Sequence, residues 1–174
     1  MIEAILFIIG SAFVVWYSIP SLRQPGSHGF YRFFAWELIL GLIALNVPTW
    51  FARPFAWYQI ISWFLLVISI IPVVAGFNLL RTVGKPQGNF EATTQLVTRG
   101  IYHYIRHPLY ASLLYLAWGL FFKSPSLLEG WIAVVASSFL YATACADEAE
   151  CIIKFGPPYA GYMKSTRRFI PFLF

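Results

Sequence analysis

Residues 100–110, GIYHYIRHPLY, hold two of the three histidines of the chain together with an arginine and three tyrosines. Pro108 suits the first turn of a helix, because the missing backbone donor of proline has no partner to lose there. Arg106 and His107 then lie directly before the helix, where free N–H groups and the helix dipole favour an anion. The segment therefore predicts a site for a carboxylate or phosphate; anchoring of Arg106 and His107 to lipid headgroups is the alternative.

The two histidines of this segment have a spacing that helical metal sites use. His103 and His107 are four residues apart, which would place both imidazoles on one face of a helix. However, Pro108 biases the preceding residue away from the helical region, and three scattered histidines supply too few ligands. We therefore predict that the chain has no metal site.

A second cluster of ionisable residues, Asp147, Glu148 and Glu150, follows the last long apolar segment. Consecutive residues of a helix point about 100° apart, so Asp147 and Glu148 do not both face one narrow site. Glu148 is the predicted pocket carboxylate, which would bind hydroxyls or a cationic group. The alternative is a solvated acidic face that Lys154 and the arginine pair at 167–168 balance.

One further acid, Glu37, lies inside an apolar segment. Ionisable residues within a membrane span are costly and are candidates for function. Glu37 is also within about two helical turns of the basic end of its segment, close enough to reach Arg32 or Arg81. Contact with a substrate and a structural ion pair are both open for this residue.

The composition predicts an all-α integral membrane protein. Of 174 residues, 59% are hydrophobic and 11% are charged, whereas soluble domains have roughly 45–50% and 25%. The net charge of +5 indicates contact with anionic lipid. Nucleic acid is not expected as a partner, because no basic stripe is interleaved with aromatic residues.

About five apolar segments are candidates for transmembrane helices, since a bilayer core needs about 20 residues per helix. These segments are residues 2–19, 33–50, 55–80, 109–122 and 131–146. Pro20 should end the first segment, and Pro72 should bend the third. The last two segments should form a helical hairpin that turns at residues 123–130; four spans followed by a re-entrant hairpin are the alternative.

The basic residues predict the orientation. Ten of the twelve lysines and arginines fall on one face, and only Arg53 and Lys123 fall on the other. We therefore expect the N-terminus outside and the C-terminus in the cytoplasm. At the cytoplasmic end, Gly156 and the two prolines after it should stop the fifth helix, and a short helix over residues 159–165 should follow.

Two motifs in the second half of the chain resemble one family of membrane enzymes. Residues 96–110, LVTRGIYHYIRHPLY, and residues 147–171, DEAECIIKFGPPYAGYMKSTRRFIP, resemble the isoprenylcysteine carboxyl methyltransferase family. The related phospholipid N-methyltransferases share this core. The resemblance covers about residues 76–174, and it is specific because two linked motifs occur at the expected separation.

The resemblance implies a membrane enzyme that uses S-adenosyl-L-methionine as its cofactor. It assigns cofactor binding to Gly100, Tyr102, Arg106, His107, Pro108, Tyr110, Asp147 and Glu148. Arg106 or His107 would pair with the carboxylate of the cofactor, and Glu148 with its hydroxyls or ammonium. Two positions depart from the family pattern, in which Asp147 is usually glutamate and Ser112 is often glycine.

Arg106, Glu148 and Glu37 are the candidate catalytic residues. The methyl acceptor is expected to be lipophilic and to enter from the bilayer, as an isoprenylcysteine-type carboxylate or a phospholipid amine. A carboxylate needs no base, whereas an amine must lose a proton to Glu37, Glu148 or His107. The sequence does not decide between these acceptors.

Two other functions are considered. Membrane sterol reductases share a related pattern of an acidic pair, a cysteine and an aromatic-glycine turn, so an NADPH-dependent reductase is one alternative. A non-catalytic membrane scaffold is the other. The sequence does not define the oligomeric state.

We expect a single membrane domain over residues 1–174. Residues 1–80 form the first three spans, 81–107 a cytoplasmic cofactor loop, 108–146 the hairpin, and 147–174 an acidic cytoplasmic helix with the C-terminal tail.

Overall fold

The computed structural model describes residues 1–87 and 92–171, and over these residues the chain is helical without strands. The helices are α1 (Ile2–Leu22), α2 (His28–Asn46), η1 (Val47–Thr49), α3 (Trp57–Thr82), η2 (Gly100–His103), α4 (Pro108–Phe121), α5 (Leu127–Phe155) and α6 (Pro157–Ser165). The prediction of an all-α fold is confirmed.

Four helices of the described chain are long and apolar enough to cross a membrane. They are α1, α2 with η1, α3 and α5, and the shorter apolar helix α4 lies beside them. The chain is therefore a multi-pass membrane protein, and its arrangement agrees with the expected count of about five spans.

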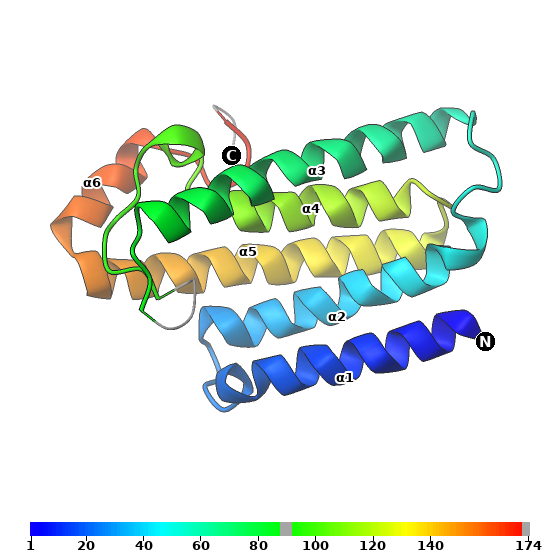
Figure 1. Cartoon of the computed structure of the whole chain (residues 1–174), viewed down its shortest axis with the longest axis horizontal. Coiled ribbons are helices and arrows are strands. Elements are labelled where there is room, and N and C mark those ends of the chain that lie inside the picture. The colour runs from blue at the N-terminus through cyan, green and yellow to red at the C-terminus, as the bar shows by residue number, and fades with distance from the viewer. Residues whose placement is uncertain (88–91, 172–174) are drawn as a thin grey trace.

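The helices α1 to α5 run side by side along the long axis of the molecule, and α6 crosses one end (Figure 1). Helix α2 packs on α1 and α5, whereas α3 packs on α4. Small residues of α5, Ala133 and Ala136, are fully buried against Leu42 of α2 and Leu120 of α4. Their size lets the helices approach closely, which is how helices associate in a lipid environment.

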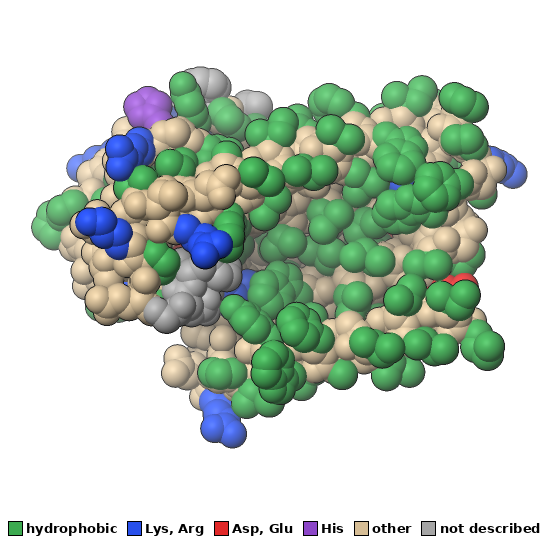
Figure 2. All heavy atoms as spheres, in the orientation of Figure 1, with side chains coloured by type: hydrophobic (Ala, Val, Ile, Leu, Met, Phe, Trp, Pro, Cys, Tyr) green, Lys and Arg blue, Asp and Glu red, His purple; other side chains and the backbone are tan. Residues whose placement is uncertain are grey.

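Apolar side chains cover the length of the helices, and lysines and arginines gather at the end that carries α6 (Figure 2). The exposed cations at this end are Arg23, Arg81, Lys85, Arg99, Lys154, Lys164 and Arg167, whereas Arg53 is exposed at the other end. The surface thus has a lipid-facing belt with one basic end, and we call this the basic end.

Serine caps begin two helices earlier than expected. Helix α2 starts at His28 because Ser27 Oγ accepts a hydrogen bond from the N–H of Phe30 at 3.2 Å. Helix α5 starts at Leu127 because Ser126 Oγ accepts one from the N–H of Glu129 at 3.2 Å. Half of the turn predicted at residues 123–130 is therefore helix, since a side-chain oxygen satisfies a first-turn donor.

The prolines and one glycine mark the other helix ends. Pro20 does not end α1, which runs on to Leu22, because a proline in the last turn removes only one hydrogen bond. Pro108 begins α4 as predicted. Gly156 ends α5 as predicted, with a φ of +61° that side-chain-bearing residues rarely adopt, and α6 then starts at Pro157 rather than at residue 159.

A buried polar cluster joins the loops at the end opposite to α6. Lys123 is 1% exposed, and its ammonium donates to Gln59 Oε1 at 2.9 Å. The same Nζ lies 3.4 Å from the ring centre of Trp63 and 5.0 Å from that of Trp50. A hydrogen bond and two aromatic faces thus stabilise a lysine that has no access to water.

Candidate functional site

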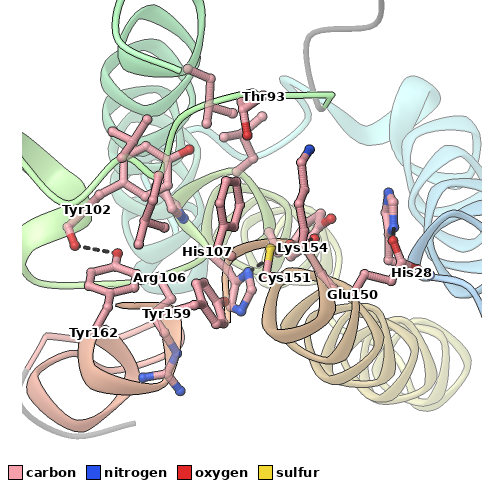
Figure 3. A pocket seen from close by; sticks show the side chains of 18 residues that line it. His28, Thr93, Tyr102, Arg106, His107, Glu150, Cys151, Lys154, Tyr159 and Tyr162 are labelled. Carbon is pink, nitrogen blue, oxygen red and sulfur yellow. Dashed lines mark hydrogen bonds and ion pairs between the residues drawn. The ribbon is translucent and has the colours of Figure 1, made fainter. Parts of the chain in front are cut away.

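An open cavity with a volume of about 160 Å³ lies at the basic end, between α4, α5, α6 and the loop before α4 (Figure 3). Its walls are formed by His28, Leu80, Thr93, Leu96, Val97, Tyr102, Arg106, His107, Pro108, Leu109, Tyr110, Asp147, Glu150, Cys151, Lys154, Phe155, Tyr159 and Tyr162.

The two predicted motifs do meet at this cavity. Six of the predicted site residues line it: Tyr102, Arg106, His107, Pro108, Tyr110 and Asp147. Gly100, Glu148 and Glu37 are not part of the lining. The amino end of α4 faces the cavity through Pro108, Leu109 and Tyr110, and a helix leaves its first N–H groups without partners inside the helix.

Gly100 shapes the loop from behind. Its φ is +62°, and a Cβ atom at this position would lie 2.7 Å from Leu79 Cδ1 of α3. Only glycine fits this conformation and this contact without a shift of the neighbouring side chain. In this structure, Gly100 therefore allows η2 to pack closely against α3.

Arg106 points its guanidinium group into the protein rather than leaving it free for a ligand. Its Nε donates to Glu148 Oε1 at 2.9 Å, and Nη2 lies 2.8 Å from the same oxygen. Nη1 donates to the carbonyl oxygens of Met163 and Thr166. The predicted contact between Arg106 and the carboxylate of a cofactor remains a prediction, because in this structure Arg106 binds α5, α6 and Thr166 after α6.

His107 lies between the two neighbouring carboxylates of α5. Its Nδ1 is 3.3 Å from Asp147 Oδ2, and its Nε2 is 3.3 Å from Glu148 Oε1. Burial alone would lower the pKa of His107, but hydrogen bonds to both carboxylates outweigh it, so the pKa is raised above its ordinary value. With both nitrogens facing acceptors, the doubly protonated ring is the species that fits.

Of the two adjacent carboxylates Asp147 and Glu148, it is Asp147 that lies at the cavity wall. Glu148 is buried behind it and accepts hydrogen bonds from Arg106 and Arg168, with Arg168 Nη2 at 2.8 Å from Oε2. The prediction that Glu148 is the pocket carboxylate therefore does not agree with the structure, in which Asp147 lines the cavity. The alternative was a solvated acidic face balanced by Lys154 and the arginine pair at 167–168; Arg168 does pair with Glu148, but Glu148 is buried rather than solvated.

Glu37 lies on α2 and does not line the cavity. Its Oε1 is buried and has no hydrogen-bond partner among the described residues. No ion pair of Glu37 with Arg32 or Arg81 accounts for this oxygen, so the roles predicted for Glu37 stay open as predictions.

A contact between His28 of α2 and Glu150 of α5, which no local sequence motif predicts, closes one side of the cavity. Glu150 Oε1 accepts from the backbone N–H of His28 at 2.9 Å, and Oε2 lies 2.6 Å from His28 Nδ1 (Figure 3). The signals were a histidine directly after the Ser27 cap and an acid one turn after Asp147. Only the packing of α2 on α5 pairs them.

Tyrosines of α6 form the wall next to His107. Tyr162 donates a hydrogen bond to the carbonyl oxygen of Tyr102, which ties α6 to η2 (Figure 3). Burial raises the pKa of Tyr159 and of Tyr162, so both remain neutral phenols. The wall therefore offers aromatic faces beside a carboxylate, which suits a ligand with a flat ring and a positive charge.

The family model for phospholipid methyltransferases matches residues 57–154, more than half of the chain. The chain belongs to this family. The matched residues include Arg106, His107, Asp147 and Glu150, whereas His28, α6 and Arg168 lie outside them. Comparisons with curated proteins and with solved structures give no match.

Membership of the phospholipid methyltransferase family implies a membrane methyltransferase activity. It agrees with the resemblance noted in the two motifs. The family match and the cavity also coincide in space, because the walls contributed by α3, the loop before α4, and α5 up to Lys154 all fall inside the matched residues.

Proposed function

We propose that this protein transfers a methyl group from S-adenosyl-L-methionine to a lipophilic acceptor that stays in the bilayer. The observation that supports the proposal most directly is the cavity at the basic end, where motif residues from α4, α5 and η2 meet beside the membrane-spanning helices. Positioning can supply much of the rate of such a transfer, because the methyl group of the sulfonium is already activated.

The residues of the cavity fit the chemical groups of this cofactor. The carboxylate of Asp147 would accept hydrogen bonds from hydroxyls or an ammonium group. The amino end of α4 and the nearby Lys154 would hold a carboxylate, since both favour negative charge. The rings of Tyr110 and Tyr159 would contact the flat base.

The family match favours a phospholipid amine as the acceptor, with an isoprenylcysteine-type carboxylate as the other candidate. An amine acceptor must lose a proton. His107 is a poor base for this step, because both of its nitrogens face carboxylates. Among the described residues, the carboxylates that line the cavity are Asp147 and Glu150, and they are the candidates to accept the proton.

We also propose that the basic end faces the cytoplasm, which places the cavity and the C-terminus there and the N-terminus outside. The gathering of exposed lysines and arginines at this end supports the proposal. A cysteine-labelling scan with a membrane-impermeant reagent, using single cysteines at positions 53 and 164, tests it: labelling of position 164 from outside would contradict it.

Methyl-labelled S-adenosylmethionine incubated with membranes that contain the full chain tests the activity. We expect label in the lipid fraction. Treatment of the product with base then identifies the acceptor, because a methyl ester releases volatile methanol and an N-methyl group does not. Absence of transfer to every lipid fraction, with the protein folded, would contradict the proposal.

Binding of S-adenosylhomocysteine separates this function from the alternatives. Retention of this product supports methyl transfer, whereas retention of NADPH in its place would favour a reductase, and binding of neither would favour a scaffold. Asp147→Asn should weaken the binding, and Glu3→Gln, which removes a carboxylate at the far end of α1, should not.

A further inference from the structure

The chain after α6 returns to the loop before α4. We call residues Thr166–Phe169 the C-terminal strap. The N–H of Arg106 donates to the carbonyl oxygen of Arg167 at 2.7 Å, and the N–H of His107 donates to that of Arg168 at 3.1 Å. The N–H of Arg167 in turn donates to Tyr104 O at 3.2 Å. Three backbone hydrogen bonds thus join two segments about 60 residues apart in the chain.

Two nitrogens of Arg168, a residue of the strap, form hydrogen bonds with the Glu148 carboxylate. Nη2 donates to Oε2 at 2.8 Å, and Nε lies 3.1 Å and 3.2 Å from the two carboxylate oxygens. Nη1 donates to Tyr141 Oη at 2.8 Å, which fixes the plane of the guanidinium group. This fork geometry is specific to arginine and holds a carboxylate in one orientation.

Glu148 in turn contacts His107, and His107 contacts Asp147 at the cavity wall. Glu148 Oε1 lies 3.3 Å from His107 Nε2, and the other ring nitrogen faces Asp147 Oδ2. The ring is confined by Tyr110, which stacks on it at 5.4 Å between ring centres, and by Phe169 of the strap at 6.3 Å. A continuous series of polar contacts therefore runs from Arg168 to Asp147 at the cavity wall.

We propose that Arg168 is a positioning residue of this methyltransferase, which holds the Asp147 carboxylate through Glu148 and His107 in the orientation that binds the ligand. The inference rests on the proposed function. Arg168 is not part of the cavity lining, so it acts on the ligand only through other residues. The cluster is suited to this task because both oxygens of Glu148 and Oδ2 of Asp147 face charged donors, which restricts the arrangement of the side chains.

A double-mutant cycle between Arg168→Met and Asp147→Asn tests the inference in the full chain. The measured quantity is the dissociation constant of S-adenosylhomocysteine in detergent or nanodiscs. Arg168→Met alone should weaken binding roughly tenfold, which is within the range for residues of one network. In the Asp147→Asn background, the same change should weaken binding by less than about twofold. A merely structural role would give losses that add.

Lys164→Met is the matched control, because it removes the same charge from an exposed position at the end of α6. It should leave the dissociation constant unchanged. Arg168→Lys covers the case in which Arg168→Met does not fold: it keeps the charge without the fork, and it should show the same dependence on Asp147 with a smaller loss.

The outcomes are distinguishable. If the unmodified chain does not bind S-adenosylhomocysteine, the proposed function fails and this inference with it. If the unmodified chain binds, but the folded Arg168 variants bind as tightly as Lys164→Met or their losses add to that of Asp147→Asn, the inference alone is overturned.

Discussion

Replacement of Glu148 by glutamine should be among the most destabilising single changes in this chain. Glu148 is 5% exposed and lies 2.8 Å from nitrogens of both Arg106 and Arg168. With His107 protonated, three cations face two carboxylates, and Glu148→Gln would raise the net charge of the buried cluster from +1 to +2. Loss of one partner from a buried ion pair costs about 3–5 kcal/mol.

Thermal unfolding of the purified protein, followed by tryptophan fluorescence, measures this effect. A loss of that size lowers the midpoint by roughly 6–20 °C for a chain of this length. Glu150→Gln is the matched control on the same helix, because its side chain is 44% exposed in the pair with His28. Such exposed pairs contribute about 0–1 kcal/mol. A shift for Glu148→Gln no larger than that for Glu150→Gln would refute the reasoning.

Three further predictions concern stability. Lys123→Met should lower the free energy of unfolding by roughly 1–3 kcal/mol, because Gln59 Oε1 loses its buried donor. Chemical unfolding measures this loss, and a loss no larger than that of a surface substitution would contradict the prediction. Since the pKa of His107 is raised above 6.5, its charged form contributes stability that is complete below pH 6.5 and is lost as the pH rises through the folded-state value. Unfolding midpoints across pH should show this loss in the unmodified chain and not in His107→Gln. Gly156→Ala should lower the free energy of unfolding by about 1–3 kcal/mol, because alanine is strained at the positive φ of this position. Gly161→Ala, in open space within α6, should not destabilise the protein. Equal unfolding midpoints for the two variants would contradict the predicted strain at Gly156.

The helices could be predicted well because each signal is local. Pro108 starts α4 and Gly156 ends α5, since a missing donor and a positive φ are properties of single residues. Helices α2 and α5 start earlier in the chain than the apolar segments predict. Apolar periodicity located them, whereas the actual boundary depends on the serine caps Ser27 and Ser126, which are polar and precede the apolar runs.

The sequence predicted which residues form the candidate site better than it predicted how these residues are arranged. Arg106, His107 and Asp147 do meet at one cavity, as two linked motifs implied. The sequence could not show that the guanidinium of Arg106 binds Glu148 and the carbonyl oxygens of Met163 and Thr166. Those partners are about 40 to 60 residues away along the chain, and only the fold brings them within hydrogen-bond distance.

By itself, the sequence determined that this chain lies in a membrane, that most of its cations fall at one end, and that two motifs hold the candidate site residues. These properties follow from composition, charge distribution and local motifs. Which of two adjacent carboxylates faces the cavity was decided by the tertiary structure alone. Asp147 and Glu148 differ by about 100° around α5, and the rotation of that helix is set by its packing on α2 and α4 and by the grip of Arg168 on Glu148.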